Sequence, residues 1–366
     1  MATPAQLRQS KLRKVLAEGE STVGTYETLD ANTPVIPVIG FPTAAIDRGK
    51  GMIDRTATMD GQAGDNASIR GSSAWTVPLE MELHDSSAKY NYWVQFLLAC
   101  GFEGIEQPDT PIIGQDTFAL APSTKTYANF NPLNVDHPPT TMSVSVIQNN
   151  NELSDYVMRT RGFTGVASFN LTTGDIAKMS VAGKALVVEA VAPGTIDDDF
   201  LDNSDVNVSQ FGDATNTWAT PYVCKAITLT ILDAASNVRD LCLQSIAINM
   251  NSNHPDFECP TEEYGFDISP VLMDTSPTVD LVFPDGDEAQ PWVFAQFRSG
   301  ALFSLQATLA SSTGRTLTFT FSRLQFQSVT LGDSGGFVNY TITAKAVRDP
   351  GTPGSDIMEI AWLYNP

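Results

Sequence analysis

The sequence contains few of the residues that metal sites and catalytic sites need. It has three histidines and four cysteines among 366 residues, and no group of them has the spacing of a zinc site. It also has no phosphate-binding Walker loop and no dinucleotide-binding fingerprint. We therefore expect no metal, no cofactor and no catalytic constellation. Since there is no CxxC pair, we interpret the cysteines as reduced and mostly buried thiols: Cys100, Cys224, Cys242 and Cys259.

Basic residues are scarce as well. Lysine and arginine number 21 against 42 acidic residues, which gives a net charge of −21 at pH 7. A surface of this charge repels nucleic-acid phosphates and anionic lipids. No apolar run approaches the roughly 18 residues that a membrane helix needs. The opening residues, MATPAQLRQSKLRKV, lack the apolar core of a signal peptide, so we expect a cytosolic product without Sec export.

One motif points towards an enzyme. Gly332-Asp333-Ser334-Gly335-Gly336 matches the sequence around the nucleophile of trypsin-like serine proteases. That reaction also needs a histidine base and a buried aspartate earlier in the chain, and none of His84, His137 and His254 has a matching context. The motif joins two segments with a strand pattern, which is typical of a hairpin. We interpret it as a turn and keep a serine hydrolase using Ser334 as a remote alternative.

An acidic stretch between residues 197 and 205 is a second candidate site. Its carboxylates are Asp197, Asp198, Asp199, Asp202 and Asp205. An EF-hand calcium loop also needs a central glycine and a terminal glutamate, and both are missing at that spacing. We therefore interpret the stretch as a solvated loop, with cation binding as the alternative.

Alternating apolar and polar residues, the pattern of a β-strand, recur throughout the first half. They cover residues 77–83, residues 142–146 and both arms of the stretch from 161 to 186. This last stretch predicts a hairpin whose tight turn contains Gly174. The glycines towards the ends of its two arms indicate bulges or close backbone approach: Gly162, Gly165 and Gly183.

Helical patterns are rare. Apolar residues at helical spacing over 93–100 predict a short amphipathic helix that begins near Trp93 and ends at Gly101. In the second half, a strand pattern at 279–283 precedes a similar helix, with Trp292 followed eight residues later by Gly300. We favour an internal duplication, with two unrelated strand–helix–strand units as the alternative. Residues 7–16 predict one further short helix.

These patterns predict a mostly β chain made of two tandem β-sandwich or barrel units, each with one short plug helix. We divide the chain into an N-terminal arm with a long loop, a first unit, a connector, a second unit and a C-terminal tail. The corresponding residues are 1–70, 71–192, 193–221, 222–348 and 349–366. The loop is rich in proline, glycine and aspartate, and loops of this length usually contact a neighbour. Disorder is the alternative.

The order of these pieces resembles the major tail tube proteins of long-tailed bacteriophages. The start, KLRKVLAEGESTVGTYETLDANTPVIPV, is similar to the family's opening strand and its Glu-Ser/Thr-Thr pattern, here at Glu20-Ser21-Thr22. GSSAWTVPLEMEL followed by WVQFLLACGF resembles the family's strand and plug helix. RGFTGVASFNLTTGDIAKMSVAG is similar to its glycine-marked hairpin. The late strands ITLTI, IAINM and TLTFTF, with their helix, carry a weaker likeness.

This resemblance implies a non-enzymatic virion protein that is assembled in the host cytoplasm into the phage tail. Copies of the chain would form stacked rings around a channel of DNA width, and DNA would pass without specific binding. A tape-measure protein and a tail terminator would be further partners, with no membrane involved.

If the halves are duplicated, three chains would close a ring of pseudo-sixfold symmetry, which we favour over a hexamer. The N-terminal arm and residues 31–70 are candidates for contacts between rings. The main alternative is another non-enzymatic virion or surface β-sandwich assembly protein.

Overall fold

The structure is a computed structural model that covers the whole chain. The part of the chain described below is residues 13–22, 24–27, 35–36, 38–39, 45–46, 52–53, 69–70, 75–84, 92–104, 123–129, 141–148, 156–187, 221–224, 227–232, 238–239, 243–251, 256–257, 267–268, 276–286, 289–311, 316–334, 336–348 and 357–364. The acidic stretch at 197–205 and most of the connector at 193–221 lie outside it.

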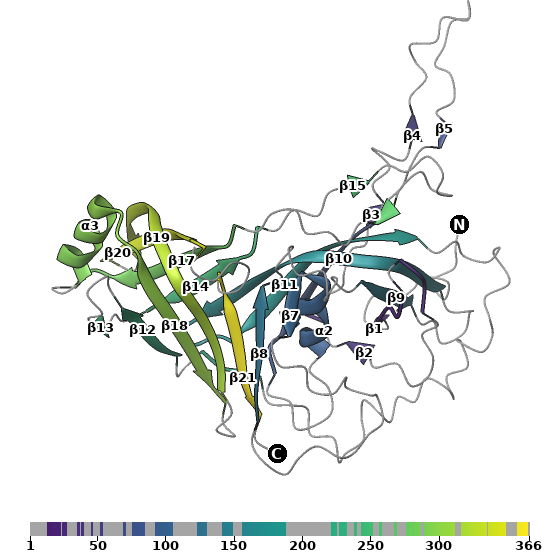
Figure 1. Cartoon of the computed structure of the whole chain (residues 1–366), viewed down its shortest axis with the longest axis horizontal. Helices are drawn as coiled ribbons and strands as arrows, with labels where there is room; N and C mark the ends of the chain where they lie inside the picture. The colour runs from purple at the N-terminus through teal and green to yellow at the C-terminus, as the bar shows by residue number, and fades with distance from the viewer. Residues whose placement is uncertain are drawn as a thin grey trace, which may run out of the picture.

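The fold is mostly β, as predicted, and nearly all strands join one large antiparallel sheet system (Figure 1). The strands before the connector are β1 (Arg13–Gly19), β2 (Val35–Ile36), β3 (Ala45–Ile46), β4 (Met52–Ile53), β5 (Ile69–Arg70), β6 (Trp75–Glu82), β7 (Phe102–Gly104), β8 (Ser123–Asn129), β9 (Met142–Gln148), β10 (Tyr156–Thr172) and β11 (Lys178–Val187). Those after it are β12 (Ile227–Leu232), β13 (Val238–Arg239), β14 (Ser245–Asn249), β15 (Asp256–Phe257), β16 (Asp267–Ile268), β17 (Thr278–Pro284), β18 (Phe303–Ala310), β19 (Thr316–Ser334), β20 (Phe337–Ala346) and β21 (Glu359–Tyr364). The helices are α2 (Tyr92–Ala99) and α3 (Ala289–Ser299).

Two groups of strands repeat one order of pairing. In the N-terminal set, neighbouring strands follow the order β2–β1–β9–β10–β11–β6–β3. In the C-terminal set, they follow the order β13–β12–β18–β19–β20–β17–β14. Every pair is antiparallel, and the members of each set occur in the same succession along the chain.

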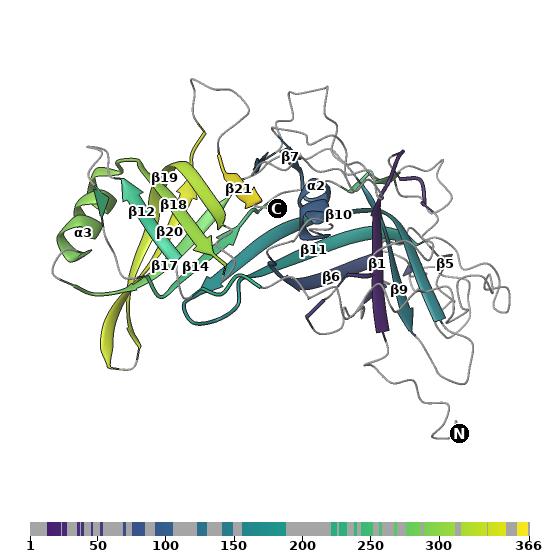
Figure 2. The same cartoon turned by 90° about the horizontal axis from the view of Figure 1, so that it is seen from below.

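Elements outside these pairings also repeat. A separate two-stranded hairpin precedes β6 (β4–β5) and another precedes β17 (β15–β16). A short helix follows β6 (α2), and another follows β17 (α3). The N-terminal set differs by the extra strands β7 and β8, which pair with each other. Figure 2 shows the N-terminal set in purple to teal and the C-terminal set in green to yellow.

The two sets are joined by backbone pairing. The end of β10 (Ser168–Thr172) pairs with β14, whose other edge pairs with β17. A second connection runs through β21, which pairs with β19 on one side and with β8 on the other. One hydrophobic core therefore runs through both sets.

Alternation in the sequence explains this core. Along β17 every second residue is buried, and β14 and β18 show the same alternation. The apolar positions that predicted the strand at 77–83 are buried, as are those at 142–146. These strand predictions and the two tryptophan-containing helices are confirmed.

Two segments differ from the sequence-based expectation. The predicted helix over residues 7–16 is wrong for its last residues, because β1 begins at Arg13 and pairs with β9. Val15, Leu16 and Ala17 of this strand are all buried, so packing against β9 prevails over local helix propensity. The segment expected as a C-terminal tail contains β21, a strand that the sequence analysis did not predict.

Candidate functional site

Three of the glycines singled out in the sequence meet on the β10–β11 ladder. Gly165 and Gly183 are directly opposite each other, and the register of β10 shifts between Arg161 and Thr164. Gly162 lies in this bulge with φ at 63°, a conformation that glycine adopts without steric cost. A Cβ atom at Gly183 would overlap the ring of Phe163, so the ring occupies the space of the missing side chain. The predicted bulge and close backbone approach are confirmed.

Helix α2 packs on this glycine cluster. The rings of Phe96 and Phe163 meet edge to face with their centroids 5.7 Å apart. Trp93, on the same helix, is fully buried, and its Nε1–H donates to the carbonyl oxygen of His84 at 3.4 Å. Gly101 follows the helix with φ at 85°, as expected of a C-terminal cap. The described apolar side chains of the helix are therefore buried in the core.

A buried carboxylate ties the first strand to the bulge. Glu20 follows β1, is 8% exposed, and lies close to the bulge of β10. One of its oxygens accepts hydrogen bonds from the backbone N–H of Gly162 (2.6 Å) and the hydroxyl of Ser143 (3.0 Å). The other accepts from the backbone N–H of Gly24 (2.7 Å) and the hydroxyl of Thr141. Four donors satisfy the carboxylate, which is what burial of a charge requires.

The residues after Glu20 fold back over the same strands. Arg161 donates from Nη1 to the carbonyl oxygen of Gly24 at 3.1 Å. The backbone N–H of Glu27 donates to the hydroxyl of Ser143 at 3.0 Å. The carboxylate of Glu27 accepts from both the hydroxyl and the backbone N–H of Ser21, and these bonds lower its pKa. Glu20 and Ser21 belong to the family-like pattern in the sequence, and nothing in that pattern indicates these contacts.

Gly174 lies at the other end of the hairpin, away from these glycines. It adopts φ of 87° in the turn between β10 and β11, as predicted. The turn contacts the C-terminal set: the N–H of Thr173 donates to the carbonyl oxygen of Gln244, and the N–H of Cys224 donates to that of Asp175. Burial and the nearby Asp175 carboxylate raise the pKa of Cys224 to about 11.

In the C-terminal set, Trp292 and Gly300 occupy the places that Trp93 and Gly101 have in the N-terminal set. Trp292 contacts the rings of Phe303 and Phe326 edge to face, with centroids 6.0 and 5.5 Å away. Gly300 ends α3 with φ at 61°, and its carbonyl oxygen accepts a hydrogen bond from Nε2 of Gln325 at 2.8 Å. Each tryptophan therefore anchors a short helix to the strands of its own set.

The described residues of the GDSGG motif, Gly332, Asp333, Ser334 and Gly336, lie at the tip of the β19–β20 hairpin, in agreement with the turn interpretation. Ser334 pairs with Phe337, and the carboxylate of Asp333 accepts a hydrogen bond from the backbone N–H of Gly336 at 3.0 Å. His84 lies next to β6 in the N-terminal set, where its Nε2 is 3.5 Å from Oε2 of Glu82. Around the tip, large apolar side chains face solvent: Leu331 at 56%, Phe337 at 72% and Val338 at 50% exposure.

Other kinds of site were also sought. In the described ranges, no group of three or more histidine, cysteine, aspartate or glutamate residues is arranged to hold a metal ion. No helix among these residues is long and apolar enough to cross a membrane. Comparison with models of known protein families gave no match, and comparison with curated proteins found no significant relative.

Proposed function

We propose that this chain is a structural protein that assembles with copies of itself into stacked rings, as a major tail tube protein of a long-tailed bacteriophage. The observation that carries the proposal is the repeated order of strands, hairpin and helix in the two sets. We interpret the sets as two tandem tail-tube units within one chain. The sequence resemblance supports this reading, since its hairpin and its plug helix lie in the N-terminal set.

The repeat favours a ring for a geometric reason. The N-terminal set binds the C-terminal set through β10 and β14, and the two surfaces differ. If the C-terminal set binds the next chain through the same kind of contact, the interface is heterologous and closes into a ring when its rotation does. With two units in each chain, three chains form a ring of pseudo-sixfold symmetry.

The charge of the chain is compatible with a channel for DNA. A net charge of −21 repels phosphates, so genomic DNA would move through the channel without adhering to its wall. In this proposal the protein belongs to the virion tail and has no catalytic role. A tape-measure protein inside the tube and a tail terminator at its end are its expected partners.

Electron microscopy of the purified protein over a range of concentrations tests the proposal. Hollow tubes or stacked rings are the expected result. Particles that remain monomers or small closed oligomers at every concentration would contradict it and favour another β-sandwich assembly protein. Addition of a tail extract as an assembly initiator, in a parallel sample, separates slow nucleation from an inability to assemble.

A further inference from the structure

We propose that the tip of the β19–β20 hairpin binds a second copy of this chain, with the edge of β19 at Thr330 paired with β3, the short strand on the outer edge of β6. This inference rests on the ring assembly proposed above and assigns the surfaces that make it. The contact between the two sets inside one chain, where β10 pairs with β14, serves as the template for the contact between chains. We call this contact the internal joint.

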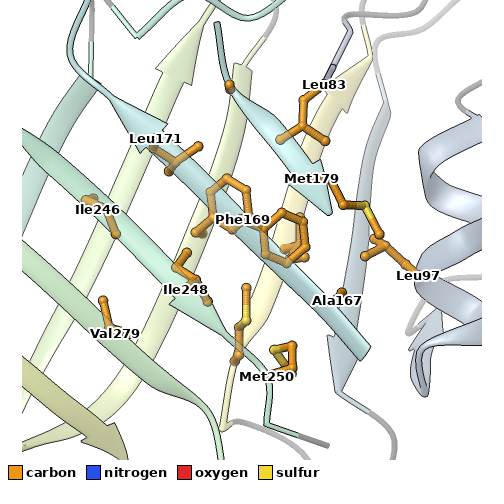
Figure 3. Packing of buried hydrophobic residues seen from close by; sticks show 14 of the residues in the cluster. Leu83, Leu97, Ala167, Phe169, Leu171, Met179, Ile246, Ile248, Met250 and Val279 are labelled. Carbon is orange, nitrogen blue, oxygen red and sulfur yellow. The ribbon is translucent and has the colours of Figure 1, made fainter. Parts of the chain in front are cut away.

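In that internal joint, β14 lies between β10 and β17 (Figure 3). Phe169 of β10 is directly opposite Ile248 of β14, and its ring meets that of Phe319 on β19 with centroids 5.1 Å apart. Phe169 is 1% exposed as a result. The joint thus combines an added strand with a covered apolar face.

The repeat defines which residues correspond. The N–H of Gln244 donates to the carbonyl oxygen of Val282 on β17, and the N–H of Ile39 donates in the same way to Glu80 on β6. We therefore align Glu80 with Val282, which aligns Thr76 with Thr278 and so Ala45 with Asn249. The two donor segments differ by one residue in length, since Ile39 is six residues before Ala45 and Gln244 is five before Asn249. From this anchor, Met81 corresponds to Phe283.

The alignment of Met81 with Phe283 also fixes which residues of the two hairpins correspond. Met81 is opposite Met179, and Phe283 is opposite Tyr340. Across each hairpin, Met179 is opposite Phe169 and Tyr340 is opposite Leu331. Leu331 is thus the counterpart of Phe169.

Leu331, the counterpart of Phe169, is not covered by a neighbouring strand among the described residues. Leu331 is 56% exposed although Tyr340, on the same face of the hairpin, is buried. Within the described residues, the segment of β19 from Thr330 to Ser334 pairs with β20 alone. The equivalent segment of β10 pairs with β14 as well as with β11. The edge of β19 beside Leu331 therefore has the two features that favour the binding of a further strand: unpaired backbone groups among the described residues and an exposed apolar side chain.

The complementary edge lies in the N-terminal set. On β17 the outer edge is covered by all five residues of β14. On β6 the corresponding described contacts are the Ile39 hydrogen bond and the two residues of β3, Ala45 opposite Thr76 and Ile46 opposite Trp75. By the internal template, the two residues of β3 pair with β6 on one side and with β19 of the next chain on the other.

A cysteine cross-link tests the predicted register. In the template, Asn249 is opposite both Ser168 and Thr278. The equivalent residues are Ala45 and Thr330, so a chain with Thr330→Cys should form a disulfide with a second chain with Ala45→Cys. Opposed residues of antiparallel strands have Cα atoms about 4.5–5.5 Å apart, within disulfide range.

Matched controls make this cross-link informative. Thr341→Cys lies one strand further from the edge, opposite Thr330, and should give about tenfold less disulfide with Ala45→Cys because the distance exceeds disulfide range. The unchanged chain and each variant alone measure the background from the native cysteines. Equal yields for Thr330→Cys and Thr341→Cys would overturn the inference.

Charge substitutions test the apolar contact. The double variant Leu331→Asp with Phe337→Asp should raise the concentration needed for ring formation by about tenfold or more, since it places charge in an apolar interface. Phe297→Asp, on an exposed position of α3, is the control and should assemble normally. Near-ultraviolet circular dichroism of the monomers shows that both variants fold.

The outcomes separate the two proposals. Rings from wild type, with neither the cross-link nor an effect of the charges, would overturn the hairpin contact and leave the proposed function standing. A wild-type chain that forms no rings or tubes would overturn both.

Discussion

The ring of Phe163 occupies the position that a side chain on Gly183 would need. The same ring meets Phe96 of α2, so this one contact joins the β10–β11 hairpin to the helix. Because Gly165 lies opposite Gly183, the two strands approach closely beneath the ring. Gly165 and Gly183 are thus glycines at the place where the ring of Phe163 packs against the sheet.

Substitution at this glycine should destabilise the fold. Gly183→Ala is expected to lower the free energy of unfolding by about 1–3 kcal/mol, because overpacking forces the Phe163 ring to move. Gly286→Ala is a suitable control, since a Cβ at that exposed position meets no atom within 4 Å. Urea denaturation of the two variants measures the difference, and equal stabilities would contradict the packing account.

The Glu20 carboxylate should be equally sensitive. Glu20→Gln replaces one acceptor oxygen by a donor, so two of the four donors lose their partner. We expect a loss of about 1.5–3 kcal/mol, the range for hydrogen bonds to a buried charged group. Glu27→Gln, at a partly exposed carboxylate, should cost less. Thermal denaturation with both variants in parallel checks this order, which a reversed ranking would refute.

Glu27 predicts a dependence on pH. Hydrogen bonds from Ser21 hold its pKa below the ordinary value of 4.5. A carboxyl group whose pKa is lowered on folding contributes stability above its unfolded pKa and loses it as the pH falls through the folded pKa. Ser21→Ala should therefore destabilise the protein at pH 7, and the difference from wild type should shrink at pH values below 4.5. A difference that stays constant from pH 7 to pH 3 would argue against this contact.

Two cysteines should resist alkylation in the folded protein. Burial raises the pKa of Cys100, and burial together with Asp175 raises that of Cys224 to about 11. The thiolate is the reactive form, so both should stay unmodified by iodoacetamide at pH 8 and react once urea unfolds the chain. Mass spectrometry of tryptic peptides assigns the modified sites. Rapid native labelling of Cys100 would show that α2 is not packed as described.

The sequence was informative where a residue's neighbours lie close along the chain. Period-two alternation located the buried face of β6 and β17, and Trp93 and Trp292 marked both helices. The turn at Gly174 and the helix cap at Gly101 are predicted from chemistry that depends on local backbone conformation alone. The hairpin interpretation of the segment that begins at Gly332 is confirmed for the same reason, since Ser334 pairs with Phe337.

Contacts between distant residues were beyond such reasoning. Glu20 and Gly162 are 142 residues apart in sequence, and nothing local indicates that one accepts a hydrogen bond from the other. The pairing of β10 with β14 likewise depends on which strand edges meet in space. Residues 13–16 have a helix-like spacing in the sequence but form a strand, because they pair with β9, which is distant in the sequence. The exposure of Leu331 indicates an interface only by comparison with Phe169, the buried residue at the equivalent position of the other hairpin.

If the two sets of strands are successive units of one ring, as proposed, each ring contains three copies of the chain. Electron microscopy of the rings, averaged without imposed symmetry, measures this number. Three copies per ring, with six similar lobes around a hollow centre, are expected. Six copies per ring, with only one set of each chain lining the channel, would contradict the tandem arrangement, and the absence of rings would contradict the assembly itself.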